Sequence, residues 1–125
     1  MLQLPALVNE QWENREGPIV LTTVDREGTP NSIYAGCVRK LDDGRILVVD
    51  NYFDKTRKNI QSGTKGAVLF ITKERKSFQI KGTVEYHKDD AVYAGMKDWV
   101  DPRYPAHAAA VVNVEQVYCG ADRLV

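Results

Sequence analysis

Residues 77–86 alternate between apolar and polar side chains with a period of two. Phe78, Ile80, Gly82, Val84 and Tyr86 fall on one side of this alternation, and polar residues fall on the other. Because successive side chains of a β-strand point to opposite faces of a sheet, the pattern predicts a strand with one buried and one solvated face. We therefore expect a sheet whose strands share one apolar face.

The other β-rich runs are short and are separated by turn signals. Asp25–Gly28 and Asp42–Gly44 predict tight turns, and residues 73–76 predict a polar hairpin turn. We predict strands at residues 19–24, 30–40, 45–50, 67–72, 77–86 and 108–114, with residues 116–119 as a seventh strand or an extension of the sixth. Gly36, inside the second run, indicates either a bend in the strand or a close approach of the backbone to a ligand.

Three short helices are predicted between these strands, at residues 5–12, 54–62 and 89–99. Each of the outer two carries apolar residues at helical spacing on one side: Leu4, Leu7, Val8 and Trp12 in the first, and Val92, Met96 and Trp99 in the last. Six or seven strands joined mostly by hairpins, with a few short helices, predict a mainly β (α+β) fold. We expect an antiparallel sheet closed on itself as a small barrel.

Length and charge limit the classes of protein to consider. The 125 residues suit one domain spanning residues 1–125. Lysine plus arginine total 17 and aspartate plus glutamate total 17, so the net charge is zero. A nucleic-acid binder or an anionic-membrane binder needs a basic excess, and neither partner is expected. No apolar run approaches the roughly 18 residues of a membrane-spanning helix.

Cysteine and histidine usage gives no metal or nucleophile motif. Cys37 and Cys119 lie far apart and form no metal-binding pair, and His87 and His107 have no zinc-ligand spacing. Residues 1–5 lack the basic region and apolar run of a secretory signal. We expect reduced thiols, a cytoplasmic protein and no metal site. We expect no nucleophilic hydrolase and no Walker-type nucleotide site, because their motifs are absent.

Basic residues crowd the start of the predicted helix at residues 54–62. Lys55, Arg57 and Lys58 occupy its first turn, where the helix dipole already places partial positive charge, and each misplaced cation costs about 0.3–1 kcal/mol. Free amides, the Lys55 ammonium and the Thr56 hydroxyl would together bind a phosphate group. A solvated basic helix face is the alternative. Asp54 is expected to cap this helix through its carboxylate, and Gly63 to end it.

The ordered set of these elements resembles a known family. The residues that carry the resemblance are Gly17–Val24, the turn Asp25–Pro30, the hairpin Asp43–Asp50, the run Lys55–Ile60 and the strand Ala67–Thr72. Together they cover roughly residues 17–86. The chain is similar to the split-barrel flavin-binding proteins related to pyridoxamine 5′-phosphate oxidase, and to their small single-domain bacterial members in particular.

The resemblance implies an FMN bound between the two subunits of a homodimer. It implies that Lys55 and Thr56 hold the phosphate, the same pair that the helix-dipole argument selects. The flavin ring would lie along the second and third strands, near Tyr34, Ala35, Gly36, Val49, Asp50 and Asn51. A C-terminal residue of the partner would cover the ring, with Tyr118 and Trp99 as candidates; packing in the core or in the dimer seam is the alternative for Trp99.

The chain departs from the oxidase itself at its C-terminus. Residues 117–125 contain no tryptophan and one arginine, Arg123, whereas the oxidase carries a tryptophan and arginines there. Vitamin B6 oxidase activity is therefore not expected, and no catalytic residue is identified. The main hypothesis is an FMN-dependent oxidoreductase or electron carrier. The alternative is a non-catalytic module that binds FMN, haem or deazaflavin, with His107 as a candidate haem ligand.

Overall fold

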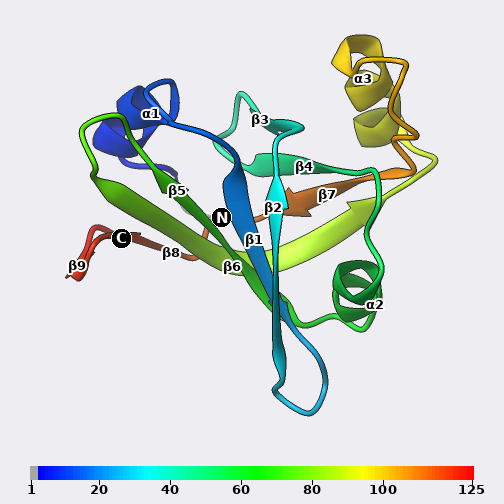
Figure 1. Cartoon of the computed structure of the whole chain (residues 1–125), viewed down its shortest axis with the longest axis horizontal. Coiled ribbons are helices and arrows are strands. Elements are labelled where there is room, and N and C mark those ends of the chain that lie inside the picture. Colours follow the sequence, from blue (N-terminus) through cyan, green and yellow to red (C-terminus); the bar gives the residue numbers. More distant parts are fainter. Residues whose placement is uncertain (1–2) are drawn as a thin grey trace.

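The computed structural model describes residues 3–125, and strands make up most of its regular structure (Figure 1). Within these residues the helices are Ala6–Trp12 (α1), Lys55–Gln61 (α2) and Ala91–Trp99 (α3). The strands are Ile19–Val24 (β1), Pro30–Ala35 (β2), Val38–Lys40 (β3), Ile46–Asp50 (β4), Lys65–Ile71 (β5), Ser77–His87 (β6), Ala108–Val112 (β7), Gln116–Cys119 (β8) and Asp122–Arg123 (β9).

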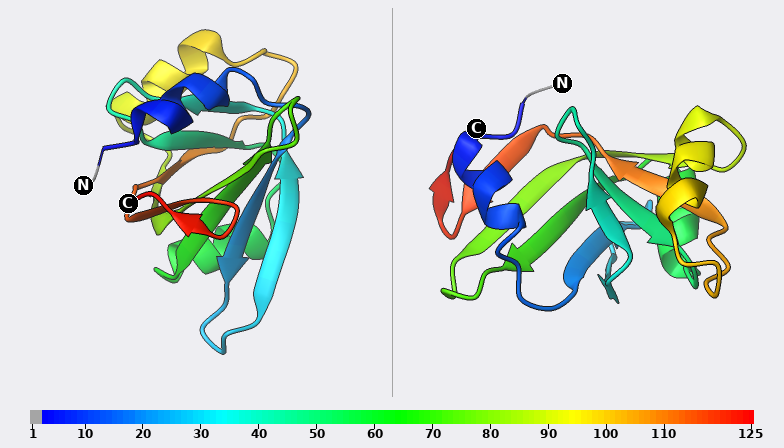
Figure 2. Two further views of the ribbon diagram at one scale, coloured as in Figure 1. Left: turned by 90° about the vertical axis from the view of Figure 1, so that its left-hand side faces the viewer. Right: turned by 90° about the horizontal axis from the view of Figure 1, so that it is seen from above.

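The strands form one antiparallel sheet that curls into a split barrel. Their order is β2-β1-β5-β6-β7-β4-β3, with β8 paired to β6 and β9 paired to β8. The 11-residue β6 belongs to both halves of the sheet, because residues 77–83 pair with β5 and residues 84–87 pair with β7. Figure 2 shows α1 and α3 at opposite ends of this sheet. The predicted antiparallel split barrel is confirmed.

The strand predicted over residues 30–40 is wrong in its continuity, because it breaks at Gly36 and Cys37. The Val38 amide donates to the Gly36 carbonyl oxygen at 3.1 Å, which closes a three-residue turn centred on Cys37. The Cys37 carbonyl oxygen accepts from the Val49 amide at 2.9 Å. β2 and β3 are therefore the two ends of the strand order, although they are neighbours in the chain. We call the stretch Gly36–Cys37, where the two edges meet, the seam.

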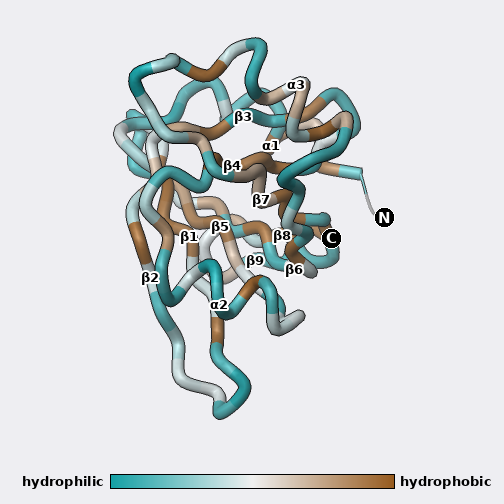
Figure 3. The backbone as a smooth tube through the Cα atoms, turned by 90° about the vertical axis from the view of Figure 1, so that its right-hand side faces the viewer, coloured by the Kyte–Doolittle hydropathy of each residue, from teal (hydrophilic) through white to brown (hydrophobic). Residues whose placement is uncertain are grey.

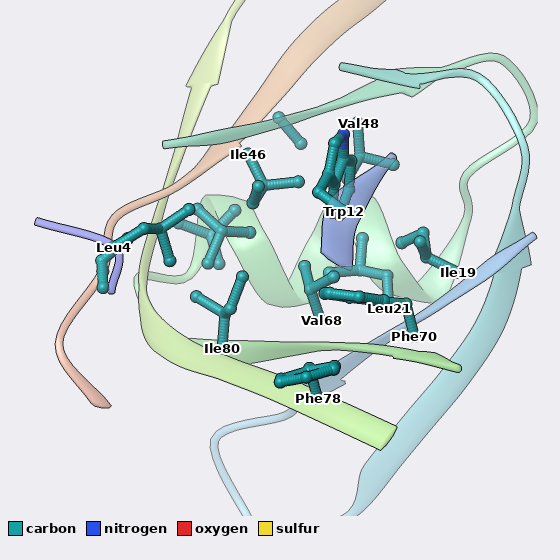
Figure 4. Close-up of a cluster of buried hydrophobic side chains, with 14 of the residues drawn as sticks. Leu4, Trp12, Ile19, Leu21, Ile46, Val48, Val68, Phe70, Phe78 and Ile80 are labelled. Carbon is teal, nitrogen blue, oxygen red and sulfur yellow. The ribbon is translucent and has the colours of Figure 1, made fainter. Parts of the chain in front are cut away.

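Apolar side chains fill the space that the curled sheet encloses (Figure 4). The strands contribute Ile19, Leu21, Ile46, Val48, Val68, Phe70, Phe78 and Ile80, and Trp12 enters from α1. The ring of Phe70 meets Trp12 edge-on and stacks on Phe78, with centroids 5.2 and 5.3 Å apart. Such pairs add about 0.5–1.5 kcal/mol each beyond the burial of their area.

β4 and β7 are buried on both faces, which explains why their sequences are continuous apolar runs rather than alternating ones. Ile46 and Val48 point into the barrel, whereas Leu47 and Val49 belong to a second cluster with Met96 of α3. In Figure 3 these strands are coloured as hydrophobic, whereas the tip of the β1–β2 hairpin is hydrophilic. α3 thus covers the outer face of the half of the sheet that ends at β4 and β3.

The helices lie where they were predicted, with two corrections in detail. Leu7 was placed on the buried side of α1 but is 40% exposed, because the buried stripe of this short helix runs through Leu4, Val8 and Trp12. Asp54 occupies the N-cap position of α2, but its side chain makes no capping hydrogen bond. Gly63 has φ +86° just beyond α2, as its predicted role requires. No helix among the described residues is long and apolar enough to cross a membrane.

Candidate functional site

A groove of about 520 Å³ lies at the seam, between the end of β2 and the end of β4. It brings together five of the residues predicted near a flavin ring: Tyr34, Ala35, Gly36, Val49 and Asn51. Alternation along β4 explains why Asp50 is not among them: the side chains of Val49 and Asn51 lie on one face, and that of Asp50 lies on the other. The remaining lining residues are Ile33, Cys37, Tyr52, Phe53 and Tyr104.

Three tyrosines surround the groove. Tyr34 is 79% exposed and Tyr52 is 77% exposed, which is unusual for such large side chains. The third, Tyr104, comes from the loop after α3. This loop is tied to the groove because the Asn51 side-chain oxygen accepts a hydrogen bond from the Ala106 amide at 3.0 Å. Tyr104 could not be found from the sequence, since only the tertiary contact of Asn51 brings it here.

Gly36 lies in the groove without a reason of packing or backbone conformation. Its φ is outside the left-handed region, and a Cβ atom built on it would meet no protein atom within 4 Å. A side chain at this position would therefore project into free space at the groove. The strand does bend here, as one interpretation of Gly36 predicted, but the backbone conformation of the bend does not itself require glycine, and the open space beside Gly36 leaves room for a ligand to approach the backbone closely.

The crowded cations at the start of α2 have three different surroundings. Arg57 turns inward and pairs with Asp50, and its Nε lies 2.8 Å from Oδ2 of that carboxylate. Lys58 lies 3.7 Å from the Asp54 carboxylate in an exposed pair. Lys55 is exposed and, within residues 3–125, forms no ion pair. Lys55 is thus the cation of this turn whose charge remains for a ligand.

Lys55 lines a second hollow of about 310 Å³, between α2 and the β1–β2 hairpin. Lys58 and Asn59 of α2 line it too, together with Asp25, Thr29, Pro30 and Asn31 of the hairpin. Because Pro30 and Asn31 precede the groove residues on β2, the hollow and the groove follow each other along this strand. An elongated ligand with an anionic end would fit the two in sequence.

Thr56 is set back from this hollow. It is 1% exposed, and its hydroxyl oxygen accepts a hydrogen bond from the Asn31 side-chain amide at 3.0 Å. The contact ties α2 to the edge strand β2. A direct contact between the Thr56 hydroxyl and a phosphate remains a prediction, and the structure adds Asn31 as a residue between the hydroxyl and the hollow.

Asp50 does not line the groove with its side chain, contrary to the neighbourhood predicted for it. The fully buried carboxylate accepts hydrogen bonds from the Phe53 amide (3.0 Å), from Nε and Nη2 of Arg57 (2.8 and 3.0 Å) and from the Tyr86 hydroxyl (2.5 Å). We call Asp50, Arg57 and Tyr86 the Asp50 clamp. It joins the end of β4 to α2 and β6.

The electrostatics of the Asp50 clamp favour the charged forms of Asp50 and Arg57. Burial opposes ionisation of Asp50, but hydrogen bonds from Arg57, Tyr86 and the Phe53 amide outweigh it and hold the pKa of this carboxyl below its ordinary value. The hydrogen bond to Asp50 raises the pKa of the Arg57 guanidinium. Burial and the neighbouring carboxylate raise the pKa of the Tyr86 hydroxyl to about 12. Asp50 and Arg57 therefore stay charged at neutral pH, and Tyr86 keeps its hydroxyl proton.

The remaining predicted residues lie away from the groove of their own chain. Tyr118 is on β8, where its hydroxyl donates to the Gln116 side chain and its ring lies 5.0 Å from the Lys81 ammonium. Its contact with a partner's flavin stays a prediction. His107 is exposed and does not line the groove, and its amide donates to the Asp50 carbonyl oxygen at 2.8 Å. Within residues 3–125 no metal-ligating group of three side chains forms.

A curled antiparallel sheet with a groove at its seam defines the split-barrel class. The family model described as pyridoxamine 5′-phosphate oxidase matches residues 7–119, and the chain therefore belongs to that family. An uncharacterised protein of Methanocaldococcus jannaschii is 30% identical to it over 119 residues, which is 90% of this chain and 79% of that protein. The predicted family membership is confirmed.

Solved structures agree with this assignment. The HupZ protein of Group A Streptococcus has a TM-score of 0.80 at 26% identity, with 94% of both chains covered. An FMN-binding protein from Syntrophomonas wolfei has a TM-score of 0.69 at 19% identity, covering 90% of this chain and 88% of that one. HutZ, a heme storage protein from Vibrio cholerae, has a TM-score of 0.70 at 17% identity, covering 94% and 95%. The last two likenesses concern the fold alone.

Proposed function

We propose that this protein binds FMN, with the ring in the groove at the seam and the phosphate in the hollow beside Lys55. Gly36 carries the proposal, because the groove meets the backbone at a glycine that neither packing nor backbone conformation requires. The unpaired Lys55 in the adjoining hollow supports it independently. FMN has a planar ring at one end, which suits the groove, and a phosphate at the other end, which suits the hollow.

The residues present fit the two ends of FMN. Tyrosine rings at the groove offer flat apolar surfaces, and β2 has one partner among the described strands, so its outer edge offers backbone amides and carbonyls. The Lys55 ammonium would supply a charge-assisted contact to the phosphate.

FMN supplies the redox chemistry when it is bound. Among the described residues, the groove is lined by no carboxylate, histidine or lysine, and the side chains there that can exchange a proton are tyrosine hydroxyls and the Cys37 thiol. The role proposed for the protein's own residues is to position the ring and to exclude water from it. We therefore propose an oxidoreductase or electron carrier and name no catalytic residue. Vitamin B6 oxidase activity is not proposed.

We further propose that the site is completed in a homodimer. The two exposed tyrosines beside the groove, Tyr34 and Tyr52, would lose their exposure if a second copy covered the seam. In such a dimer Tyr118 of the second copy is the proposed cover for the ring. Light scattering on the flavin-loaded protein tests this arrangement: we expect twice the chain mass, and a monomer that retains flavin would refute it.

Haem is the second candidate ligand, and the exposed His107 favours it. This histidine follows the loop that carries Tyr104, and its amide is fixed by the carbonyl of Asp50, at the end of the strand that leads to the groove. The overall likeness to the heme storage protein HutZ is compatible with this alternative. A deazaflavin would use the same groove as FMN. The protein would then hold its ligand without turning over a substrate.

Absorption spectra of the purified protein separate these functions. The protein is incubated with FMN or with haem, desalted, and its spectrum recorded. We expect flavin bands in a ratio of one FMN per chain, and an affinity for FMN well above that for riboflavin, which lacks the phosphate. A Soret band retained by the parent and lost in His107→Ala would favour haem instead. Uptake of neither ligand would show the proposal to be wrong.

A further inference from the structure

One short segment carries both ends of the proposed cofactor site. Asn51, Tyr52 and Phe53 line the groove, and Lys55, two residues further on, lines the hollow. A ligand that occupies both spaces therefore depends on how residues 51–55 are held. Any tilt of this segment would change the position of Lys55 relative to the groove.

The segment has little intrinsic order of its own. α2 has seven residues, and isolated helices of that length are not stable in water. Its N-cap residue, Asp54, makes no side-chain hydrogen bond to the first turn, so the usual local device for starting a helix is absent. Something other than local sequence must fix where α2 begins.

The Asp50 clamp supplies this restraint from beneath the segment. One oxygen of the buried carboxylate accepts from the Phe53 amide and from Nη2 of Arg57, at 3.0 Å each. The other oxygen accepts from Nε of Arg57 and from the hydroxyl of Tyr86. Asp50 therefore forms hydrogen bonds to the chain on both sides of Lys55, at Phe53 and at Arg57, and its bond from Tyr86 holds this segment against β6.

We propose that Asp50 and Arg57 are positioning residues that set the separation between the ring groove and the phosphate-binding Lys55, so that FMN is recognised as one unit. This inference rests on the FMN function proposed above and adds residues that do not themselves contact the ligand. Burial of an ion pair is weak evidence for stability, since apolar residues of similar volume often do as well. The Asp50–Arg57 contact is bidentate and lies against the segment that joins the two ligand spaces. This geometry favours a positioning role.

The direction in which Asp50→Asn changes FMN affinity distinguishes a positioning role from a long-range electrostatic effect. Removing a negative charge near Lys55 would strengthen phosphate binding if only long-range charge mattered. If the clamp positions Lys55, the same change weakens FMN binding, by about tenfold, while riboflavin binding changes less. Tyr86→Phe removes one arm of the clamp and keeps both charges, and we expect it to fold and to weaken FMN binding by about threefold.

The experiment compares FMN and riboflavin affinities by fluorescence titration in the parent, Asp50→Asn and Tyr86→Phe. Val68→Ala, a core change away from the clamp, is the matched control for lost stability. Hydrogen exchange is measured on the same proteins without ligand, at the Phe53 amide, which donates to the Asp50 carboxylate, and at the Lys58 amide, which donates to the Asp54 carbonyl oxygen. We expect faster exchange and a lower ratio of FMN to riboflavin affinity in both clamp variants, and an unchanged ratio in Val68→Ala.

Three outcomes would overturn the proposal. These are an unchanged or higher affinity ratio in both clamp variants, exchange at Phe53 and Lys58 as slow as in the parent, and an equal fall of the ratio in Val68→Ala. A parent protein that binds no FMN would instead refute the proposed function. In that case the exchange rates, which need no ligand, still decide whether the clamp orders the segment.

Discussion

A Cβ atom placed on Gly82 would stand 1.7 Å from the carbonyl oxygen of Asn113. The contact lies where β6 changes partners, since Lys81 pairs with Gln116 of β8 and Val84 pairs with Val112 of β7. Residues 113–115 bulge across this point, with the Asn113 amide donating to the Thr83 carbonyl oxygen at 2.9 Å. The close approach lets one strand serve both halves of the sheet.

Gly82→Ala is expected to destabilise the fold strongly. The added methyl group must displace backbone, so we expect a loss of about 3 kcal/mol in the free energy of unfolding, at the upper end of overpacking effects. Urea denaturation of the two proteins measures it. Gly95→Ala on α3 is the control, because a Cβ there meets no atom within 4 Å, and alanine should stabilise a helix by about 0.5–1 kcal/mol. A Gly82→Ala protein as stable as the parent would contradict the close approach of Asn113 to Gly82.

Lys55→Ala is expected to weaken FMN binding by about 1.5–3 kcal/mol, because it removes a charge-assisted contact to the phosphate. Riboflavin affinity should remain close to that of the parent. Lys73→Ala, in the polar turn before β6, is the control for loss of a surface charge. Isothermal titration gives both affinities, and an FMN affinity that matches the parent would rule out the phosphate assignment.

Gly36→Ala is expected to separate binding from stability. A methyl group projects into open space, so the unfolding midpoint should stay near that of the parent. At the proposed groove the same methyl group would clash with the ring, and we expect FMN affinity to fall by about 1–3 kcal/mol. Thermal unfolding and flavin titration on one preparation check both. Unchanged flavin affinity would remove the main support for the ring position.

Asp50→Asn is expected to cost stability as well as affinity. Asparagine at position 50 loses the charge-assisted bidentate contact to Arg57, and because the Arg57 side chain is 34% exposed to water we expect a loss of about 1–3 kcal/mol in the free energy of unfolding. The lowered pKa of Asp50 gives the pH dependence its sign: the carboxylate contributes stability above its unfolded pKa of about 4, and this is lost as pH falls through the lower folded pKa. Urea unfolding between pH 7 and pH 3 should therefore show a smaller acid loss in the variant than in the parent.

His87 is expected to titrate above its ordinary pKa. Partial burial opposes its protonation, but hydrogen bonds to Asp90 and Glu85 outweigh this and raise the pKa of the imidazole. A raised folded pKa contributes stability that is fully present below the unfolded value of about 6.5 and is lost as pH rises through the folded value. Proton NMR titration of the His87 ring should give a midpoint above about 6.5. His87→Gln should lose the corresponding alkaline decline in stability, and a midpoint below that value would contradict the two contacts.

Local patterns in the sequence predicted most of the fold. Alternation over residues 77–86 and the turn at Asp42–Gly44 depend on neighbouring residues alone, and both are confirmed. A bend at Gly36 was one of two interpretations, but a full break of the strand was not predicted, because Cys37 turns where its carbonyl accepts the Val49 amide, a contact between residues far apart in the chain. β9 has only two residues and shows no alternation that could be recognised.

The candidate site was predictable where its residues belong to β2, β4 and the start of α2. Val49 and Asn51, which were expected near the ring, line the groove, whereas the strand period of two places the Asp50 side chain on the opposite face. Tyr104 and Asn31 were missed, since one depends on a loop tied by Asn51 and the other on a hydrogen bond to Thr56. No local spacing encodes either contact.

The Asp50 clamp also limits how this sequence can change over generations. Replacing Arg57 leaves the fully buried Asp50 carboxylate without its counter-charge, at a cost of about 3–5 kcal/mol, whereas replacing Asp50 leaves an Arg57 that is 34% exposed and costs less. The first of these costs is a large part of the 5–15 kcal/mol typical of a whole domain. Single steps away from the pair are therefore disfavoured, and the two positions should covary among descendants, either kept together or exchanged together for an apolar pair.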